Sequence, residues 1–221
     1  SAIALGDSGT ASGAQAIAIG ESSLASGTNS TAIGFGTKAT GTNDYAAGTG
    51  ATASGGLSTA IGYKAYASGG GNDATGGVSA SAIAIGYEAR AVSQDVGNTA
   101  IAIGNKATAI KSGIAIGYDS KAPQDGAIAL GWQADATNSL SGVAIGDRAK
   151  ATGNNAIASG GNPNNSATQA IGNGAMAVGS GSKATGVGTV ALGGLGGTAG
   201  GSVADKDFAV AIGAAALANI I

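Results

Sequence analysis

The chain has 221 residues, of which 43 are glycine, while only 4% are aromatic and 10% are charged. So few bulky side chains cannot fill a thick globular core, and a net charge of −2 with no basic stripe excludes a nucleic-acid-binding surface. Because cysteine and histidine are absent, we expect no disulfide bond, no thiol chemistry, no zinc or other metal site and no cofactor.

The N-terminal part of the chain defines a repeat of 14 residues. Glycine recurs at this spacing at Gly6, Gly20, Gly34, Gly48 and Gly62, and these anchor glycines mostly follow a run of alanine and β-branched residues. A fixed short period is typical of a solenoid, in which one small unit is stacked many times. Variants of the phrase continue to Gly213. We therefore expect one domain of about fourteen coils over residues 1–221.

Each repeat predicts two short strands. Residues 16–19, Ala-Ile-Ala-Ile, are of strand length and rich in β-branched side chains. After the anchor glycine, residues 37–40 alternate polar and small side chains, which is typical of a strand with one face in water. Glycine, serine and charged residues between these segments favour turns. The sequence therefore predicts an all-β fold, a flat parallel β-roll in which equivalent strands pair about 4.8 Å apart.

The first strand of the repeat is apolar on both faces, so we expect both faces to be buried. One face can pack inside the roll, with large isoleucines over small alanines, and the other requires a cover. We predict self-association through this strand, and the residue pattern leaves open which face meets the partner chain. The alternative is a monomer that other domains of a longer protein cover. The predicted interface and core isoleucines are Ile17, Ile19, Ile33, Ile61, Ile83, Ile85, Ile101, Ile103, Ile114, Ile116, Ile128 and Ile145.

Four insertions interrupt the period, at residues 69–81, 92–99, 161–174 and 194–207. We place each of them after a second strand and before the next first strand, so that all four leave the roll at one edge. Insertions on one side of a solenoid often bind ligands, but such an edge can also simply tolerate extra length. A loop that crosses to a neighbouring chain is a third interpretation.

Five aromatic residues directly follow anchor glycines, so we expect a stripe of rings at the tips of the first turns. Exposed aromatic residues are frequent in binding sites, which makes them candidate ligand contacts; alternatively, they stack on one another and shield the edge. These residues are Phe35, Tyr63, Tyr87, Tyr118 and Trp132. The sequence offers no catalytic constellation, and we expect that the protein is not an enzyme.

The hexapeptide Asn29-Ser30-Thr31-Ala32-Ile33-Gly34 closely resembles the Asn-Ser-Val-Ala-Ile-Gly repeat of YadA-like head domains. These are heads of trimeric autotransporter adhesins, with hemagglutinin- or invasin-type repeats, on Gram-negative bacteria. The resemblance implies a left-handed β-roll and a homotrimer packed through its inner strands. It also implies display at the cell surface, with outer-membrane attachment through a C-terminal segment outside this chain, and a role in virulence through binding to host extracellular matrix or cell-surface molecules.

Two other functions stay open at this point. One is a structural spacer that presents another domain. The other is an ice-binding solenoid, which would require a regular threonine ladder; Thr10, Thr40, Thr52 and Thr185 share no single repeat position. Both chain ends fall in or near repeat units, so we expect a longer parent protein.

Overall fold

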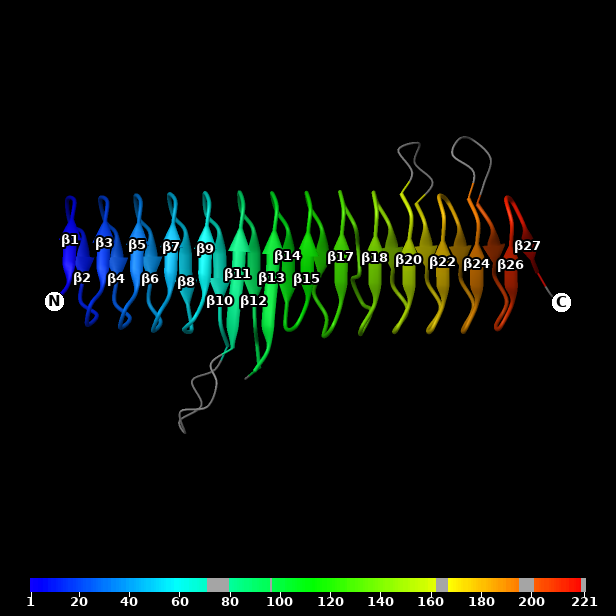
Figure 1. Cartoon of the computed structure of the whole chain (residues 1–221), viewed down its shortest axis with the longest axis horizontal. Coiled ribbons are helices and arrows are strands. Elements are labelled where there is room, and N and C mark those ends of the chain that lie inside the picture. The colour runs from blue at the N-terminus through cyan, green and yellow to red at the C-terminus, as the bar shows by residue number, and fades with distance from the viewer. Residues whose placement is uncertain (71–79, 96, 162–166, 195–200, 220–221) are drawn as a thin grey trace. The chain divides into compact units, whose positions relative to one another are not determined.

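The computed structural model describes residues 1–70, 80–95, 97–161, 167–194 and 201–219. The described residues form short parallel strands and no helix, which confirms the predicted all-β solenoid (Figure 1). The chain divides into two compact units, residues 1–112 and 113–221. Whether they act as one domain stays a prediction, and the left-handed sense of the roll stays an implication of the family resemblance.

Unit 1 contains two parallel sheets that alternate along the chain. We call them the first sheet and the second sheet, after the order of their strands in each coil. The first sheet consists of β1 (Ile3–Leu5), β3 (Ile17–Ile19), β5 (Thr31–Ile33), β7 (Tyr45–Ala47), β9 (Thr59–Ile61), β11 (Ser81–Ile85) and β13 (Thr99–Ile103). The second sheet consists of β2 (Thr10–Ala11), β4 (Leu24–Ala25), β6 (Lys38–Ala39), β8 (Thr52–Ser54), β10 (Tyr66–Ser68), β12 (Arg90–Val92) and β14 (Thr108–Ile110).

Unit 2 repeats this arrangement. Its first sheet consists of β15 (Ile114–Ile116), β17 (Ile128–Leu130), β18 (Val143–Ile145), β20 (Ile157–Ser159), β22 (Met176–Val178), β24 (Val190–Leu192) and β26 (Val210–Ile212). Its second sheet consists of β16 (Lys121–Ala122), β19 (Lys150–Ala151), β21 (Gln169–Ala170), β23 (Lys183–Ala184), β25 (Val203–Ala204) and β27 (Leu217–Ala218). Between β16 and β19, Asp135 continues the ladder through parallel bridges to Lys121 and Lys150.

The core between the two sheets is a thin layer of alanine. Ala18 and Ala32 of the first sheet and Ala25 and Ala39 of the second sheet are fully buried. The isoleucines alternate with these alanines and point outward, because successive side chains of a strand face opposite sides. The prediction that isoleucine packs over alanine inside the roll is therefore wrong. Alanine methyl groups make up most of the buried layer between the sheets, and small polar residues such as Ser30 and Thr37 are buried at its margins.

Tight turns at both edges reverse the chain. At the first turn, the amide of Ala65 donates a hydrogen bond to the carbonyl of Gly62 (3.3 Å), and Lys64 has φ +50°, as the third residue of a type II turn requires. The anchor glycines are needed for space as well as for conformation. Gly20 has φ +125°, and a Cβ atom there would lie 2.5 Å from the carbonyl oxygen of Gly34 in the next coil. Stacking at the 14-residue period therefore excludes larger residues at this position.

The insertions leave the solenoid at two different edges. Those predicted at 69–81 and 92–99 lie between a second strand and the next first strand, as expected. The other two lie between β20 and β21 and between β24 and β25, so they connect a first strand to a second strand. The predicted ranges 161–174 and 194–207 are therefore wrong in part, because each contains a strand. Residues 71–79, 96, 162–166 and 195–200 lie outside the described residues.

Candidate functional site

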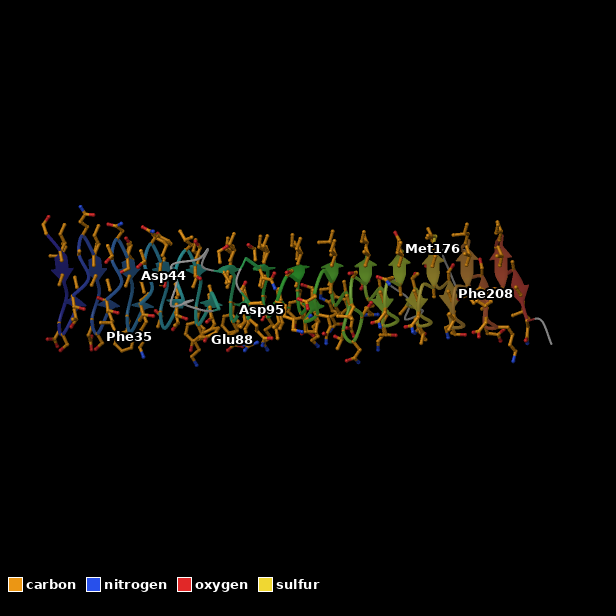
Figure 2. The ribbon with its side chains drawn as sticks, turned by 90° about the horizontal axis from the view of Figure 1, so that it is seen from below. Phe35, Asp44, Glu88, Asp95, Met176 and Phe208 are labelled. Carbon is orange, nitrogen blue, oxygen red and sulfur yellow. The ribbon has the colours of Figure 1, made fainter. Side chains whose placement is uncertain are left out.

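The outward face of the first sheet is uncharged and mostly apolar in both units. Among the described residues, no strand of this sheet contains a lysine, arginine, aspartate or glutamate, whereas the second sheet includes Lys38, Arg90 and Lys150. Ile19, Ile33 and Ile61 are each 37% exposed on this face. In unit 2, Met176 of β22 projects from the same sheet (Figure 2). An exposed surface that is mostly apolar is typical of interaction surfaces in proteins.

The structure places all twelve predicted interface isoleucines on first-sheet strands, in outward-facing and half-buried or exposed positions. They form two rows, one at each end of the strands, because two outward side chains alternate with one buried alanine. The rows continue through the parallel pairing of equivalent residues, for example Ile83 with Ile101 and Ile85 with Ile103. Their role in an interface stays a prediction.

Other residues interrupt these rows, and the sequence analysis did not single them out. In unit 1, Tyr45 pairs with Thr31 on one side and Thr59 on the other, while Ala47 pairs with Ile33 and Ile61. In unit 2, Ser159 pairs with Ile145 and Val178. Aligning the repeats by their 14-residue period identifies these residues, because they replace the isoleucine, valine or leucine found at the same position of other coils.

The predicted aromatic residues lie at the tips of the first turns and are all exposed; Phe35, at 55%, is the most exposed of the five. Phe35 and Glu88 both lie along the lower margin of unit 1 in Figure 2. The rings of Tyr63 and Tyr87 stack with centroids 5.2 Å apart in unit 1. Tyr118 and Trp132 stack at 5.9 Å in unit 2. The stacking interpretation is confirmed for these two pairs, and a role in ligand binding stays a prediction.

Cationic side chains lie over several of these rings. The Nζ atom of Lys64 is 5.2 Å from the centroid of Tyr63, and the guanidinium carbon of Arg148 is 4.5 Å from the centroid of Trp132. On the neighbouring second sheet, Arg90 lies 5.8 Å from the ring of Tyr66. Each distance is within the range of a cation–π interaction. The first-turn edge and the second sheet thus present aromatic and basic groups together, a combination that the spacing of the aromatic residues does not indicate.

Buried hydroxyl groups link successive coils beneath this edge. Thr37 Oγ1 donates a hydrogen bond to the carbonyl of Gly48 (2.8 Å), and Thr168 Oγ1 does the same to the carbonyl of Gly179 (2.8 Å). In both cases the acceptor is an anchor glycine of the following coil. These hydroxyls satisfy backbone groups that the narrow core would otherwise leave unpaired. Their positions indicate a structural role.

Asp44 is a buried carboxylate at the second turn of unit 1. Its Oδ2 accepts a hydrogen bond from the amide of Gly41 (2.6 Å), and its Oδ1 accepts one from the amide of Ser58 (2.9 Å). Burial raises the pKa of Asp44 above its ordinary value of 3.8, although the backbone amides oppose this shift. The carboxylate bridges two coils and faces backbone amides, so we assign it a structural role.

Within the described ranges, no group of three or more Asp or Glu residues is placed to hold a metal ion. The same residues contain no helix that is long and apolar enough to cross a membrane.

The fold and its surfaces define a class of protein: a parallel β-solenoid with a thin alanine core, one uncharged face and one polar, partly aromatic face. The family model of the YadA head domain repeat matches residues 1–20, 11–37, 39–65, 53–75, 111–134, 136–162 and 170–195. These segments together cover more than half of the chain, so the chain belongs to the YadA head domain family.

A search of solved structures found a similar chain, the collagen-binding domain of the Yersinia adhesin YadA. The two chains are 22% identical, with a TM-score of 0.43, and the match covers 80% of this chain and 69% of the Yersinia chain. No curated protein sequence matched.

Proposed function

We propose that this chain is the head of a bacterial surface adhesin and that it assembles as a homotrimer through the first sheet. The uncharged outward face of that sheet is the main support, because leaving its apolar side chains exposed to water is costly. Every coil contributes to it, and the charged residues of the described strands lie on the second sheet. Family membership and the resemblance to trimeric autotransporter heads support the same arrangement.

Three chains suit the shape of this face. Each first-sheet strand presents only two or three outward side chains, so the face is narrow in each unit. Three such faces around one axis each meet two neighbours, and a closed rotational arrangement leaves no face open for further association. All chains then run in the same direction. Their second sheets and first turns remain at the outside of the assembly.

The outward surface supplies the adhesive contacts in this proposal. It combines stacked rings, such as Tyr63 on Tyr87, with the basic groups of Lys64 and Arg90. Rings and arginine are frequent among the energetically important residues of interfaces. Three copies of each contact would give avidity from weak single contacts. The Yersinia domain is described as collagen-binding. For this chain we propose the broader class of host extracellular-matrix and cell-surface molecules.

We propose that the chain acts at the bacterial cell surface, attached to the outer membrane through a segment outside it, and that it has no enzymatic role. Ice binding is less favoured, because Leu24, Lys38 and Tyr66 interrupt the outward threonine row of the second sheet in unit 1. The spacer alternative is distinguished by exchanging this segment in a bacterial adhesin for a solenoid of equal length. Unchanged attachment of the cells would support the spacer.

Beads that display the chain test adhesion directly. We expect them to bind surfaces coated with matrix proteins, and we expect the double substitution Tyr63→Ala/Lys64→Ala to weaken this binding several-fold. Thr10→Ala, at an exposed position of the same unit, serves as the control. Beads that bind neither matrix proteins nor host cells would contradict the proposed function. If Thr10→Ala and the double variant lost binding equally, the first turn that carries Tyr63 and Lys64 would not be a specific contact site.

A further inference from the structure

A solenoid built from near-identical coils has a problem of register when it associates with copies of itself. Equivalent strands are about 4.8 Å apart, so sliding one chain by one coil places nearly the same side chains opposite each other. In unit 1 the outward side chains of β3 are Ile17 and Ile19, and those at the equivalent positions of β11 and β13, which pair with each other, are again isoleucines. Uniform positions of this kind specify register weakly.

One coil of unit 1 departs from this uniformity in both rows at once. At β7 the outward residues are Tyr45, which is larger than isoleucine, and Ala47, which is smaller. The neighbouring coils have Thr31 and Thr59 in the row of Tyr45, and Ile33 and Ile61 in the row of Ala47. The Tyr45 ring is 38% exposed in the single chain. The large and small residues therefore share one coil, and the coils on both sides differ from it.

We infer that Tyr45 and Ala47 set the register in which copies of this chain align, an inference that rests on the proposed self-association. In a rotationally symmetric assembly of parallel chains, one edge of each first sheet faces the opposite edge of its neighbour. The row of Tyr45 then faces the row of Ala47. In register, each tyrosine ring occupies the space that the alanine of the next chain leaves.

A chain that slides by one coil loses this fit in the interfaces with both of its neighbours. Tyr45 would then face Ile33 or Ile61, where the space is already filled, and Ala47 would face Thr31 or Thr59 and leave a gap. Overfilled and underfilled contacts both destabilise a packed interface. Tyr45 and Ala47 thus stabilise the aligned assembly and destabilise assemblies that are shifted by one coil.

Disulfide formation can measure the register, because the natural chain contains no cysteine. One tagged chain with Ile85→Cys is co-expressed with an untagged chain that has either Ile83→Cys, in the same coil, or Ile101→Cys, one coil away. A chain with Ile103→Cys, paired with Ile83→Cys, reports the shift in the other direction. A disulfide requires Cα atoms within about 7 Å, so a shift of one coil decides which pair can bond.

The test compares these cross-links in two backgrounds, after the molar mass of each has been measured. In the unsubstituted background we expect the same-coil pair to dominate. In Tyr45→Ile/Ala47→Ile, which removes the large and the small residue of this coil, we expect an unchanged mass and at least about a tenfold increase in the offset products relative to the same-coil product. Tyr66→Ile is the matched control, because Tyr66 is also 38% exposed and begins a strand, but lies on the second sheet.

The outcomes separate the two proposals. A trimer whose cross-links stay within one coil in the double variant would overturn the role of Tyr45 and Ala47 and leave the assembly intact. Offset cross-links already abundant in the unsubstituted chain, or equally increased by Tyr66→Ile, would overturn it too. A molar mass that corresponds to a single folded chain would overturn the proposed self-association and, with it, the proposed register.

Discussion

Tyr63 and Tyr87 stack with their ring centroids 5.2 Å apart and their planes inclined by 16°, although an insertion separates their coils in the sequence. The insertion lies between β10 and β11, at the second turn. The first turns that carry Tyr63 and Tyr87 therefore still stack directly on each other. The Glu88 amide donates a hydrogen bond to the carbonyl of Tyr63 (2.9 Å), which holds the two turns in register. The stripe of rings is therefore a product of coil stacking and not of sequence proximity.

Removing one ring of this pair should have a small and local effect. We expect Tyr87→Ala to lower the free energy of unfolding by about 0.5–1.5 kcal/mol beyond the loss of buried area, as is typical of aromatic pairs. Tyr87→Phe retains the ring and should have little effect. Denaturant titration of both variants provides the measurement. A loss of equal size in Tyr87→Phe would show that the hydroxyl group, and not the stacking, is responsible.

The anchor glycines should differ in their tolerance of substitution. Gly20→Ala places a Cβ atom 2.5 Å from the Gly34 carbonyl oxygen at φ +125°, so we expect a loss of at least about 3 kcal/mol of stability. Gly36 has φ +61° and no atom within 4 Å of a built Cβ, so Gly36→Ala should cost only about 1–2 kcal/mol. Chemical denaturation measures both. Equal losses would contradict the account of coil stacking.

Asp44 should make stability depend on pH in an unusual direction. Its pKa is raised by burial, so between its ordinary value of 3.8 and the higher folded value the folded chain binds more protons than the unfolded chain. Stability from this group is therefore fully present below the ordinary pKa and is lost as pH rises through the folded pKa. Serine stands at the paired positions in the neighbouring coils, Ser30 and Ser58, so Asp44→Ser is a conservative comparison.

Denaturation of the parent chain and of Asp44→Ser at several pH values between 7 and 4 checks this prediction. We expect the parent to gain stability relative to the variant as the pH falls. A relative loss on acidification would mean that the hydrogen bonds from Gly41 and Ser58 outweigh burial and lower the pKa instead.

Trp132 is the sole tryptophan of the chain and reports on its own cation–π contact. We expect Arg148→Gln to change the fluorescence emission of Trp132 and to lower stability by about 0.5–1 kcal/mol, the range for an exposed pair. Arg90→Gln removes the corresponding contact to Tyr66 in unit 1 and should leave the emission unchanged. An unchanged spectrum in Arg148→Gln would show that the contact does not persist in solution.

The repeat sequence predicted the strands, the turns and the aromatic stripe, because each depends on the 14-residue period alone. It did not predict the orientation of Ile19 and Ala18, since a strand that is apolar on both sides looks the same in either orientation. Only the spacing between the sheets excludes the isoleucines from the core. The last two insertions were misplaced because extra residues after Gly160 and Gly193 delayed the second strand, and fixed offsets from these glycines then fell inside the insertion.

The buried polar groups required knowledge of the stacked coils. Asp44 replaces a serine or alanine of the repeat, and the sequence gives no indication that two amides from different turns converge on it. The layer of Tyr45 and Ala47 becomes visible only when the coils are aligned by strand pairing. Residues that depart from the repeat, such as Asp44 and Tyr45, therefore distinguish one coil from another, which the 14-residue period alone cannot do.

Light scattering over a dilution series can establish whether sister chains cover the uncharged face of the first sheet. For a chain of 20.3 kDa we expect about three times this mass down to micromolar concentration. We expect Ile33→Asp, which places a charge on that face, to dissociate the assembly, and Lys38→Asp on the second sheet to leave it intact. A stable, folded single chain at micromolar concentration would contradict the account.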